Sequence, residues 1–591
     1  MIKKILIFSL VLVIGILSRF YNLNWDSMSM LHPDERFLIM VTEKLIIPNS
    51  LYSYLDTSSS TLNPHNLGFN FYVYGTLPII VLRLVANYFS ISNIGDLLIL
   101  GRQISAFYDV LTAILVFLIA RRISPRTNLP ILTLIAYFST TLSLQLSHFF
   151  TVDTSLVFFL TLTVYLLLGS SSNQKSINLL STVMAGLSYG LAISSKISAL
   201  YLLPFIVFYF IQKLIIHKKF GQLLLSGILF LIFTVASLRM GYPYLFNSPA
   251  LVAGINPEVI ADWKELNYFY SHSTYQDPAS YIFPPATMFL STTPIIFPLI
   301  NLVNWGFGPA FSIIMLFSLA KLMSHLSINR SSIKRLVISP WALITFWMIS
   351  IFLIQGVQFL LYLRYFYPIV PAASLLVAFG LQQIYLKNKF VAFISIFFLL
   401  IWPISFTKIY STPHTRIQAS DWIYNNLPTG STIAFEHWDD PLPLYRPNQL
   451  NSRFNLVELT MFDKESQAKW RKIYSTLNSS DYLVISSNRV YASTLSLPDR
   501  YPTNKKYYEL LFSGQMGFTK IAEFSSRPGL SIPLNICIQL PGNNYGKQIQ
   551  NTLPCNGIEF IDDYSDESFT VYDHPRVYIF KKTGVIPNLG V

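Results

Sequence analysis

The sequence predicts a polytopic α-helical membrane protein with a soluble α/β domain at its C-terminal end. Hydrophobic residues make up 52% of the 591 residues and charged residues only 12%, whereas a soluble protein carries about 25% charged residues. The shortage of charge lies in the first two thirds of the chain, and the last third has the composition of an ordinary globular domain. Short basic clusters also recur between the apolar runs, as they do in the loops of membrane proteins.

The apolar runs predict about eleven transmembrane helices, since one span needs about 20 mostly apolar residues. The first run begins at Lys3 and Lys4 like a signal peptide but lacks a small-residue cleavage site. We therefore expect it to remain as a span that starts in the cytoplasm. The predicted spans cover residues 4–21, 103–121, 128–147, 152–170, 178–195, 198–214, 222–239, 308–325, 337–358, 365–385 and 389–407.

The basic clusters give the orientation, because lysine and arginine accumulate on the cytoplasmic side of membrane proteins. The clusters lie at residues 120–126, 212–220, 329–335 and 386–389. The net charge of +13 is divided among them and forms no single patch. This distribution argues against a nucleic-acid partner.

Two long segments are predicted to lie on the outer side of the membrane. The apolar run at 77–90 is short and is interrupted by Pro78 and Arg83, and counting it as a span would move the first basic cluster outside. We therefore interpret 22–102 as one large outer loop whose helices lie in the membrane interface. Residues 240–307, rich in Tyr, Trp and Pro, are predicted to form a second outer loop.

Because the first span is expected to start in the cytoplasm, an odd number of spans places the C-terminal region, residues 408–591, on the same outer side as the two loops. Residues 418–436 have the pattern of a helix, a Pro-Thr-Gly turn and a strand, which is typical of an α/β domain. Further strands are predicted at 481–487 and 576–582, and a helix ended by glycine at 506–514. Cys537 and Cys555 also lie in this region, either as a disulfide in an oxidising space or as two buried thiols.

An acidic pair follows the first span closely, in the motif HPDERF at residues 32–37. Pro33 suits the first turn of a helix, so Asp34 and Glu35 are expected at a helix N-terminus, where the helix dipole favours ionised carboxylates. An anion held beside a membrane can act as a general base, a metal ligand or a binder of cations. The alternative is that these residues only cap the helix.

Further charged residues are predicted at the outer ends of spans. The accumulation of lysine and arginine on the cytoplasmic side does not explain the cations among them. They are Arg102, Asp153, Lys196, Arg239 and Arg364. An anionic ligand at the outer interface, such as a lipid-linked phosphate, would account for the cations. For each single cation, the alternative is a side chain that reaches toward lipid headgroups.

Several of these motifs together resemble bacterial relatives of the protein O-mannosyltransferases. The motifs are HPDERF and the stretches at 63–78, 101–113, 148–159, 190–204 and 364–371, in this order along the chain. The family consists of integral-membrane glycosyltransferases of the C superfold (GT-C) that use a polyprenyl-phosphate sugar donor. The stretches at 419–443 and 566–582 also resemble the region that follows the membrane module in a bacterial branch of this family.

The resemblance implies roles for individual residues. It makes Asp34 the general base and gives Glu35 a supporting role in geometry or acceptor binding. It places Lys196, Arg364 and Arg102 near the donor phosphate. It also implies a cavity that includes His32, Asp153, His148 and Tyr74, and a single displacement that inverts the anomeric carbon. Because the acidic pair of the family often lacks a preceding HP, the role of His32 is left open, with orientation of Asp34 as the simplest one.

The resemblance further implies a polyprenyl-phosphate sugar donor, a protein, lipid or glycan acceptor, and surrounding membrane lipids as partners. It implies a location in the cell membrane with the active site and the C-terminal domain outside. No cofactor is certain, and a divalent ion near Asp34 and Asp153 is left open. The stretch EHWDDPLP at 436–443 is interpreted as a solvated acidic loop or acceptor-contacting edge rather than as a metal site.

Two other functions compete with sugar transfer. A transporter or glycolipid flippase would place charged residues near the middle of the membrane and show internal repeats of spans, neither of which is evident in the sequence. A non-catalytic envelope assembly protein would leave the carboxylates of the first loop on the surface, away from any cavity.

Overall fold

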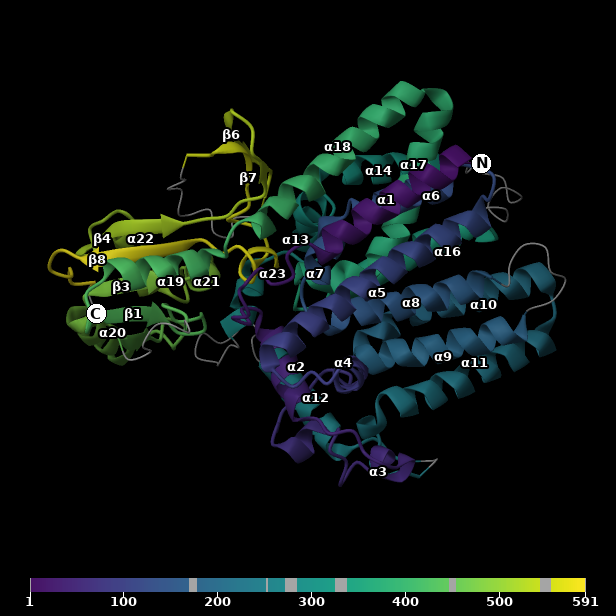
Figure 1. Ribbon diagram of the computed structural model, residues 1–591, viewed down its shortest axis with the longest axis horizontal. Helices are drawn as coiled ribbons and strands as arrows, with labels where there is room; N and C mark the ends of the chain where they lie inside the picture. The colour runs from purple at the N-terminus through teal and green to yellow at the C-terminus, as the bar shows by residue number, and fades with distance from the viewer. Residues whose placement is uncertain are drawn as a thin grey trace.

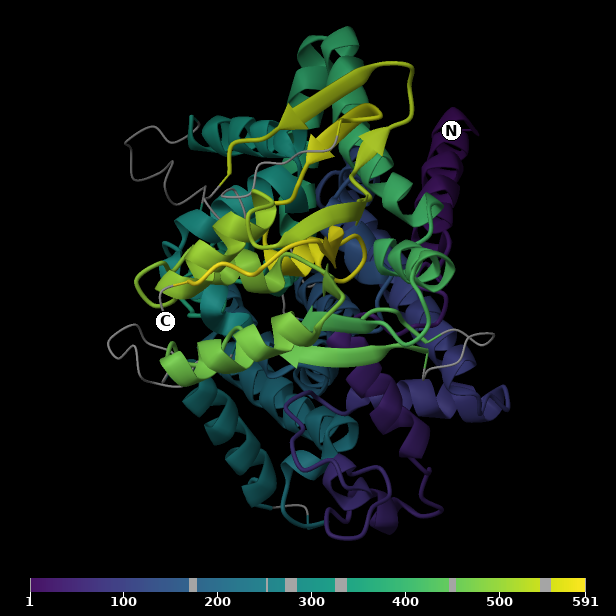
Figure 2. The same ribbon diagram turned by 90° about the vertical axis from the view of Figure 1, so that its left-hand side faces the viewer.

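The computed structural model describes residues 2–169, 178–250, 253–271, 284–324, 337–445, 453–542 and 554–589. A body of long helices lies beside a smaller α/β part that is built around β-sheets (Figure 1). The N-terminus lies at the end of the helical body that points away from the sheets (Figure 1). Figure 2 shows the sheets in front of the helical body.

Helices occupy all eleven windows that are predicted to span the membrane, because each window is an apolar run long enough for several helical turns. They are α1 (Ile2–Phe20), α5 (Ile94–Ile123), α6 (Leu129–Phe138) with α7 (Thr141–Ser147), α8 (Val152–Leu168), α9 (Leu179–Ser195), η2 (Ile197–Leu202) with α10 (Leu203–His217), α11 (Phe220–Gly241), α14 (Pro309–Met323), α16 (Pro340–Gly356), η6 (Leu363–Ile369) with α17 (Val370–Lys387), and α18 (Lys389–Thr407).

Length and hydropathy alone give a lower number of spans. In the described part of the chain, five helices are long and apolar enough to cross a membrane, or up to seven if each bent pair of helices is one span. The bends measure 62° between α6 and α7, and 118° between the segment Ile296–Gly306 and α14. The multi-pass helical class is therefore confirmed, and the number of eleven spans stays a prediction.

The first outer loop contains short helices that pack together. They are α2 (Pro33–Lys44), α3 (Leu51–Leu55), η1 (Pro64–Leu67) and α4 (Leu77–Tyr88). Helix α4 has 12 residues, a length of about 18 Å, which is too short for a hydrocarbon core of about 30 Å. Its apolar face is buried against α2 and the start of α5.

Helix α5 begins at Ile94, ahead of the predicted span that starts at residue 103, and the bounds of the outer loop stay a prediction. Asn93 caps the helix, and its Oδ1 accepts hydrogen bonds from the backbone N–H of Gly95 at 2.7 Å and of Asp96 at 3.4 Å. Arg102, which was interpreted as lying outside the span, is fully buried and paired with carboxylates. The helix therefore continues through this position.

The second outer loop packs against the first. It contains η3 (Pro243–Leu245), α12 (Pro257–Ser271), η4 (Pro284–Ser291), α13 (Ile296–Asn301) and the π-helical turn η5 (Leu302–Gly306). Asp262 accepts a hydrogen bond from the backbone N–H of Tyr72 at 3.1 Å, and the Thr76 hydroxyl donates to the Gly241 carbonyl at 3.0 Å. The first part of the second loop thus packs on the first loop.

The C-terminal part is an α/β domain, as the sequence predicts. Its main sheet has the strand order β2-β1-β3-β8-β4, in which β2, β1 and β3 are parallel and β8 and β4 are antiparallel to their neighbours. The strands are β1 (Thr432–Glu436), β2 (Asn455–Leu459), β3 (Tyr482–Ile485), β4 (Phe518–Phe524) and β8 (Val577–Lys582). The helices of this region are η7 (Lys408–Ser411), α19 (Thr415–Asn426), α20 (Gln467–Ser479), α21 (Arg489–Leu495), α22 (Pro502–Phe512) and α23 (Glu567–Thr570).

A second, three-stranded sheet has the order β5-β7-β6, with β5 (Gly529–Leu530), β6 (Asn535–Gln539) and β7 (Gly557–Ile561). Cys537 on β6 and Cys555 before β7 form a disulfide, with their Cα atoms 5.5 Å apart. Of the two alternatives left by the sequence, the structure therefore selects the bridge.

The C-terminal region is also built into the helical body. Phe569 and Tyr572 belong to the same buried core as the helices. The Asp566 carboxylate accepts a hydrogen bond from the backbone N–H of Leu363 at 3.1 Å, and the Gln145 amide donates to the Phe569 carbonyl at 2.8 Å. The segment around α23 thus lies against η6 and α7.

Candidate active site

A cavity of about 530 Å³ lies where the first loop, the neighbouring helix ends and the C-terminal domain meet. Of the residues predicted for the site, it is lined by Asp34, Tyr74, Asp153, Lys196 and Arg364. These residues come from the first loop, α8, the end of α9 and η6. Its volume is within the usual range of small-molecule sites, about 300–1,000 Å³.

Asp34 lies in the first turn of α2, as predicted. Pro33 occupies the start of the helix and His32 is its N-cap, whose Nδ1 accepts a hydrogen bond from the backbone N–H of Glu35 at 3.4 Å. The Asp34 carboxylate forms an ion pair with Arg364, with 2.5 Å between Oδ2 and Nη1. Asp34 thus has a fixed cation beside it at the wall of the cavity.

This cation decides the protonation state of Asp34. Burial by itself raises the pKa of the carboxyl group, but Arg364, with smaller contributions from His32 and Lys196, lowers it to about 2. Burial and the Asp34 carboxylate raise the pKa of Tyr74 well above its usual value. At neutral pH the cavity therefore presents an ionised carboxylate, which can accept a proton, beside a protonated phenol.

A second ion pair lies in the same cavity. The Lys196 ammonium is 2.8 Å from Oδ1 of Asp153 and lies over the ring of Tyr365, 4.4 Å from its centroid. Asp153 is in the first turn of α8, and Lys196 follows the last turn of α9. Two separate helix ends therefore bring a cation and a carboxylate to the cavity that holds Asp34.

Glu35 and Arg102 do not line the cavity. Arg102 is fully buried and binds Glu35 through Nε at 2.9 Å and Nη2 at 2.6 Å. It also binds Asp26 through Nη1 and Nη2, both at 2.9 Å, and donates to the Leu23 carbonyl at 2.7 Å. Since its guanidinium donors are occupied by these partners, the structure gives Arg102 a place in the scaffold and not at the expected donor phosphate.

The two histidines also lie outside the lining of the cavity. His32 caps α2, and its ring packs on Tyr572 with 4.1 Å between centroids. His148 faces the backbone carbonyls of Leu144 and Tyr21 with its two ring nitrogens, at 2.8 and 3.0 Å. His32 can therefore orient the turn that carries Asp34, whereas His148 connects segments of the helical body.

The C-terminal domain contributes residues to the cavity that the sequence did not assign to it. They are Trp438, Asp439, Asp440, Arg489 and Tyr572, and Arg36 of the first loop faces them. Within the stretch 436–443, the two aspartates are not solvated, because Asp439 and Asp440 are both paired with the buried Arg416, at 2.5 and 2.6 Å. The alternative of an acceptor-contacting edge stays a prediction. No local sequence pattern signals these neighbours, which are about four hundred residues from the first loop.

The carboxylates of the cavity are not arranged as a metal site. Within the residues that the structure describes, no group of three or more His, Cys, Asp or Glu side chains is placed to hold a metal ion. Asp34 and Asp153 each face a cation of the protein, Arg364 and Lys196. The residues present thus suit an anionic ligand, which can compete for the two cations, better than a divalent ion.

One known family matches part of the chain. The model of the dolichyl-phosphate-mannose-protein mannosyltransferases matches residues 94–240. This stretch is therefore similar to that family. This match indicates a membrane glycosyltransferase rather than a transporter or a non-catalytic assembly protein. No curated protein matches the chain.

Several solved structures are similar to the chain to different degrees. The archaeal oligosaccharyltransferase AglB from Archaeoglobus fulgidus has a TM-score of 0.51 at 12% identity, over 85% of this chain and 72% of AglB. ArnT from Cupriavidus metallidurans has a TM-score of 0.42 at 13% identity, over 83% of this chain and 94% of that one. The S. cerevisiae protein O-mannosyltransferase Pmt1-Pmt2 complex has a TM-score of 0.30 at 17% identity, over 41% and 33%. The likeness to AglB confirms the predicted C superfold.

Proposed function

We propose that the protein transfers a sugar from a polyprenyl-phosphate donor to an acceptor hydroxyl at the outer face of the membrane, with inversion at the anomeric carbon. The observation that carries this proposal is the cavity in which an ionised Asp34 lies beside Arg364 and near Lys196. The family matched by residues 94–240 is named for a dolichyl-phosphate-linked mannose and a protein acceptor. AglB has been solved in complex with a dolichol-phosphate and an inhibitory peptide.

The proposed reaction is a single displacement. The acceptor oxygen forms a bond to the anomeric carbon while the bond from this carbon to the phosphate oxygen breaks. The acceptor proton passes to Asp34, and the electron pair leaves with the polyprenyl phosphate. Because the hydroxyl becomes acidic only as the new bond forms, a carboxylate of low pKa can take its proton late in the reaction.

The cations stabilise the leaving group in this mechanism. Negative charge grows on the phosphate as the glycosidic bond breaks, and fixed cations in a partly buried site stabilise charge that develops in the transition state. Arg364 and Lys196 now face Asp34 and Asp153 at 2.5 and 2.8 Å. A bound phosphate would share these cations, which places it next to the base and therefore next to the anomeric carbon.

The proposed side of the membrane follows from the predicted orientation. The cavity is lined by the first loop, the ends of α8 and α9, η6 and the C-terminal domain. Every one of these segments is predicted to lie outside when the basic clusters lie in the cytoplasm. The N-terminus, predicted to be cytoplasmic, lies at the opposite end of the helical body from the sheets (Figure 1).

The direct test is incubation of the purified protein with defined polyprenyl-phosphate sugars and with peptide, lipid or glycan acceptors. Mass analysis of the lipid product and of the acceptor should show release of polyprenyl phosphate together with a glycosylated acceptor. An anomeric configuration opposite to that of the donor would support the single displacement. Movement of the lipid across a vesicle membrane without covalent transfer would contradict the proposal.

Replacing Arg364 tests the role of the cation. Arg364→Gln should lower kcat/KM for the donor about 10–100-fold, because a hydrogen bond to a charged group is worth about 1.5–3 kcal/mol. It should also change the pH profile, since burial still raises the pKa of Asp34 once the guanidinium that lowers it is gone. The pKa should then exceed its ordinary value of 3.8, and activity should fall as the pH drops through the new value.

The measurement is kcat/KM from about pH 4 to pH 8 for both proteins. The wild type should show no loss from Asp34 in this range, because its carboxylate stays ionised down to about pH 2. Arg364→Lys is the matched control and should keep the flat profile, since it keeps a positive charge. A flat profile for Arg364→Gln would contradict the proposed coupling of Arg364 to Asp34.

A further inference from the structure

The C-terminal domain contacts α2 on both sides of Asp34. Before Asp34, the ring of His32 packs on Tyr572 with 4.1 Å between centroids. After it, the Arg36 guanidinium donates from Nη2 to Oδ1 of Asp440 at 2.8 Å. The two contacts lie four residues apart, so together they fix the first turn of the helix that carries Asp34.

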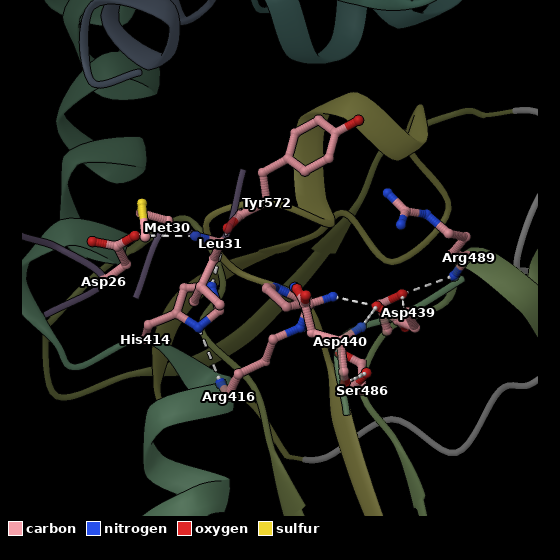
Figure 3. A network of polar contacts seen from close by, with 12 residues as sticks. Asp26, Met30, Leu31, His414, Arg416, Asp439, Asp440, Ser486, Arg489 and Tyr572 are labelled. Atoms are coloured by element: carbon pink, nitrogen blue, oxygen red, sulfur yellow. Dashed lines mark hydrogen bonds and ion pairs between the residues drawn. The ribbon is translucent and has the colours of Figure 1, made fainter. Parts of the chain in front are cut away.

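Asp440 is itself held by the domain. Its Oδ2 accepts a hydrogen bond from Arg416 at 2.6 Å, and its backbone carbonyl accepts from the Ser486 hydroxyl at 2.8 Å. Arg416 is buried and also binds Asp439 at 2.5 Å. Figure 3 shows Arg416, Asp439 and Asp440 close together. Both carboxylate oxygens of Asp440 are thus used by arginines, which makes it a bridge between α2 and α19.

Tyr572 is fixed in a similar way. Its backbone carbonyl faces Nε2 of His414 at 3.2 Å. The neighbouring Asp573 accepts hydrogen bonds from the Tyr410 hydroxyl at 2.9 Å and from the Gln145 amide at 3.0 Å. The segment that carries Tyr572 is therefore tied both to the C-terminal domain and to the helical body.

We propose that the C-terminal domain positions the catalytic helix, with Asp440 and Tyr572 as positioning residues that aim Asp34 into the cavity. This inference rests on the proposed function of Asp34. It assigns the domain a role in the chemistry, in addition to any role in acceptor binding. Asp440 acts through Arg36, because both of its own oxygens are occupied.

The test compares Asp440→Asn with Asp563→Asn in the full-length protein. Asp563 is a matched control, because its side chain is 18% exposed against 17% for Asp440 and it too is paired with two arginines, Arg527 and Arg576. It does not line the cavity. Asp440→Asn should lower kcat about ten-fold or more, since small displacements of a catalytic group cost up to about 100-fold. Asp563→Asn should leave kcat within about two-fold of the wild type.

A loss in kcat with unchanged KM values distinguishes a positioning role from a role in substrate binding. The donor and acceptor KM values of Asp440→Asn should stay within about two-fold of the wild type, because Arg36 and Arg416 already occupy both carboxylate oxygens of Asp440. Arg36→Gln should reproduce the loss, and the double variant should lose no more than either single variant, since both remove the same bridge. If Asp440→Asn fails to accumulate, Arg36→Gln alone carries the test.

Tyr572 offers a second, independent comparison. Tyr572→Phe keeps the ring that packs on His32 and should retain kcat, whereas Tyr572→Leu should lower it about ten-fold. Equal kcat for Asp440→Asn and Asp563→Asn, or a loss found only in the acceptor KM, would overturn the inference. Absence of transfer by the wild type with every donor would instead refute the proposed function, and would be seen before any variant is compared.

Discussion

Asp34→Asn should lower kcat about 1,000-fold while leaving the protein folded, because general-base catalysis contributes about 10²–10⁴-fold. The asparagine has nearly the same shape but cannot take a proton from the acceptor. Arg364 would lose its carboxylate partner at 2.5 Å and remain available to a phosphate, so the KM for the donor should not rise. Steady-state kinetics with a polyprenyl-phosphate sugar measures both constants.

A matched control for this variant is Asp96→Asn. Asp96 is an exposed carboxylate in the first turn of α5 and does not line the cavity. It should keep wild-type kinetics, which separates the loss of one base from a general loss of negative charge. Activity of Asp34→Asn within about ten-fold of the wild type would remove Asp34 from the mechanism.

Arg102→Gln should destabilise the protein by about 3–5 kcal/mol, the usual cost of removing one member of a buried ion pair. The reason is that Asp26 and Glu35 would then face each other in the interior without the guanidinium that binds both. Both carboxylates are fully buried. Thermal unfolding in detergent should show a clear fall in Tm relative to the wild type.

Lys520→Gln is the control for this prediction. Lys520 pairs with Glu523 but is itself 36% exposed, and exposed pairs contribute about 0–1 kcal/mol. Its Tm should therefore stay close to that of the wild type. A stable Arg102→Gln variant with weak donor binding would instead support the expected contact between Arg102 and the donor phosphate.

Asp34 and its two cations show which parts of the site are visible in the sequence. Asp34, Lys196 and Arg364 were selected because charge is costly near hydrocarbon, and each was predicted at the outer end of an apolar run. The structure places all three on one cavity, and their catalytic and phosphate-binding roles remain predictions. Arg102 met the same criterion, but its partners Asp26 and Glu35 lie far from it in the sequence. Sequence position therefore does not distinguish a cation that is free to bind a ligand from one that is neutralised inside the fold.

The bridge between Arg36 and Asp440 is the clearest case of information that only the fold holds. The two residues are 404 positions apart, and neither has a local pattern that points to the other. The stretch 436–443 was interpreted as a solvated acidic loop or acceptor-contacting edge because the sequence does not show Arg416 packed against it.

The sequence by itself determined the membrane-spanning class, the α/β nature of the C-terminal region, and the short list of charged residues at the ends of apolar runs. Hydropathy, periodicity and turn residues are local properties, so they can be read from neighbours along the chain. Only the tertiary structure decided which carboxylate meets which cation, where helix α5 begins, and that the C-terminal domain contacts the helix of Asp34. These features depend on contacts between distant segments, and in a buried site the partner of a charge decides whether it serves stability or chemistry.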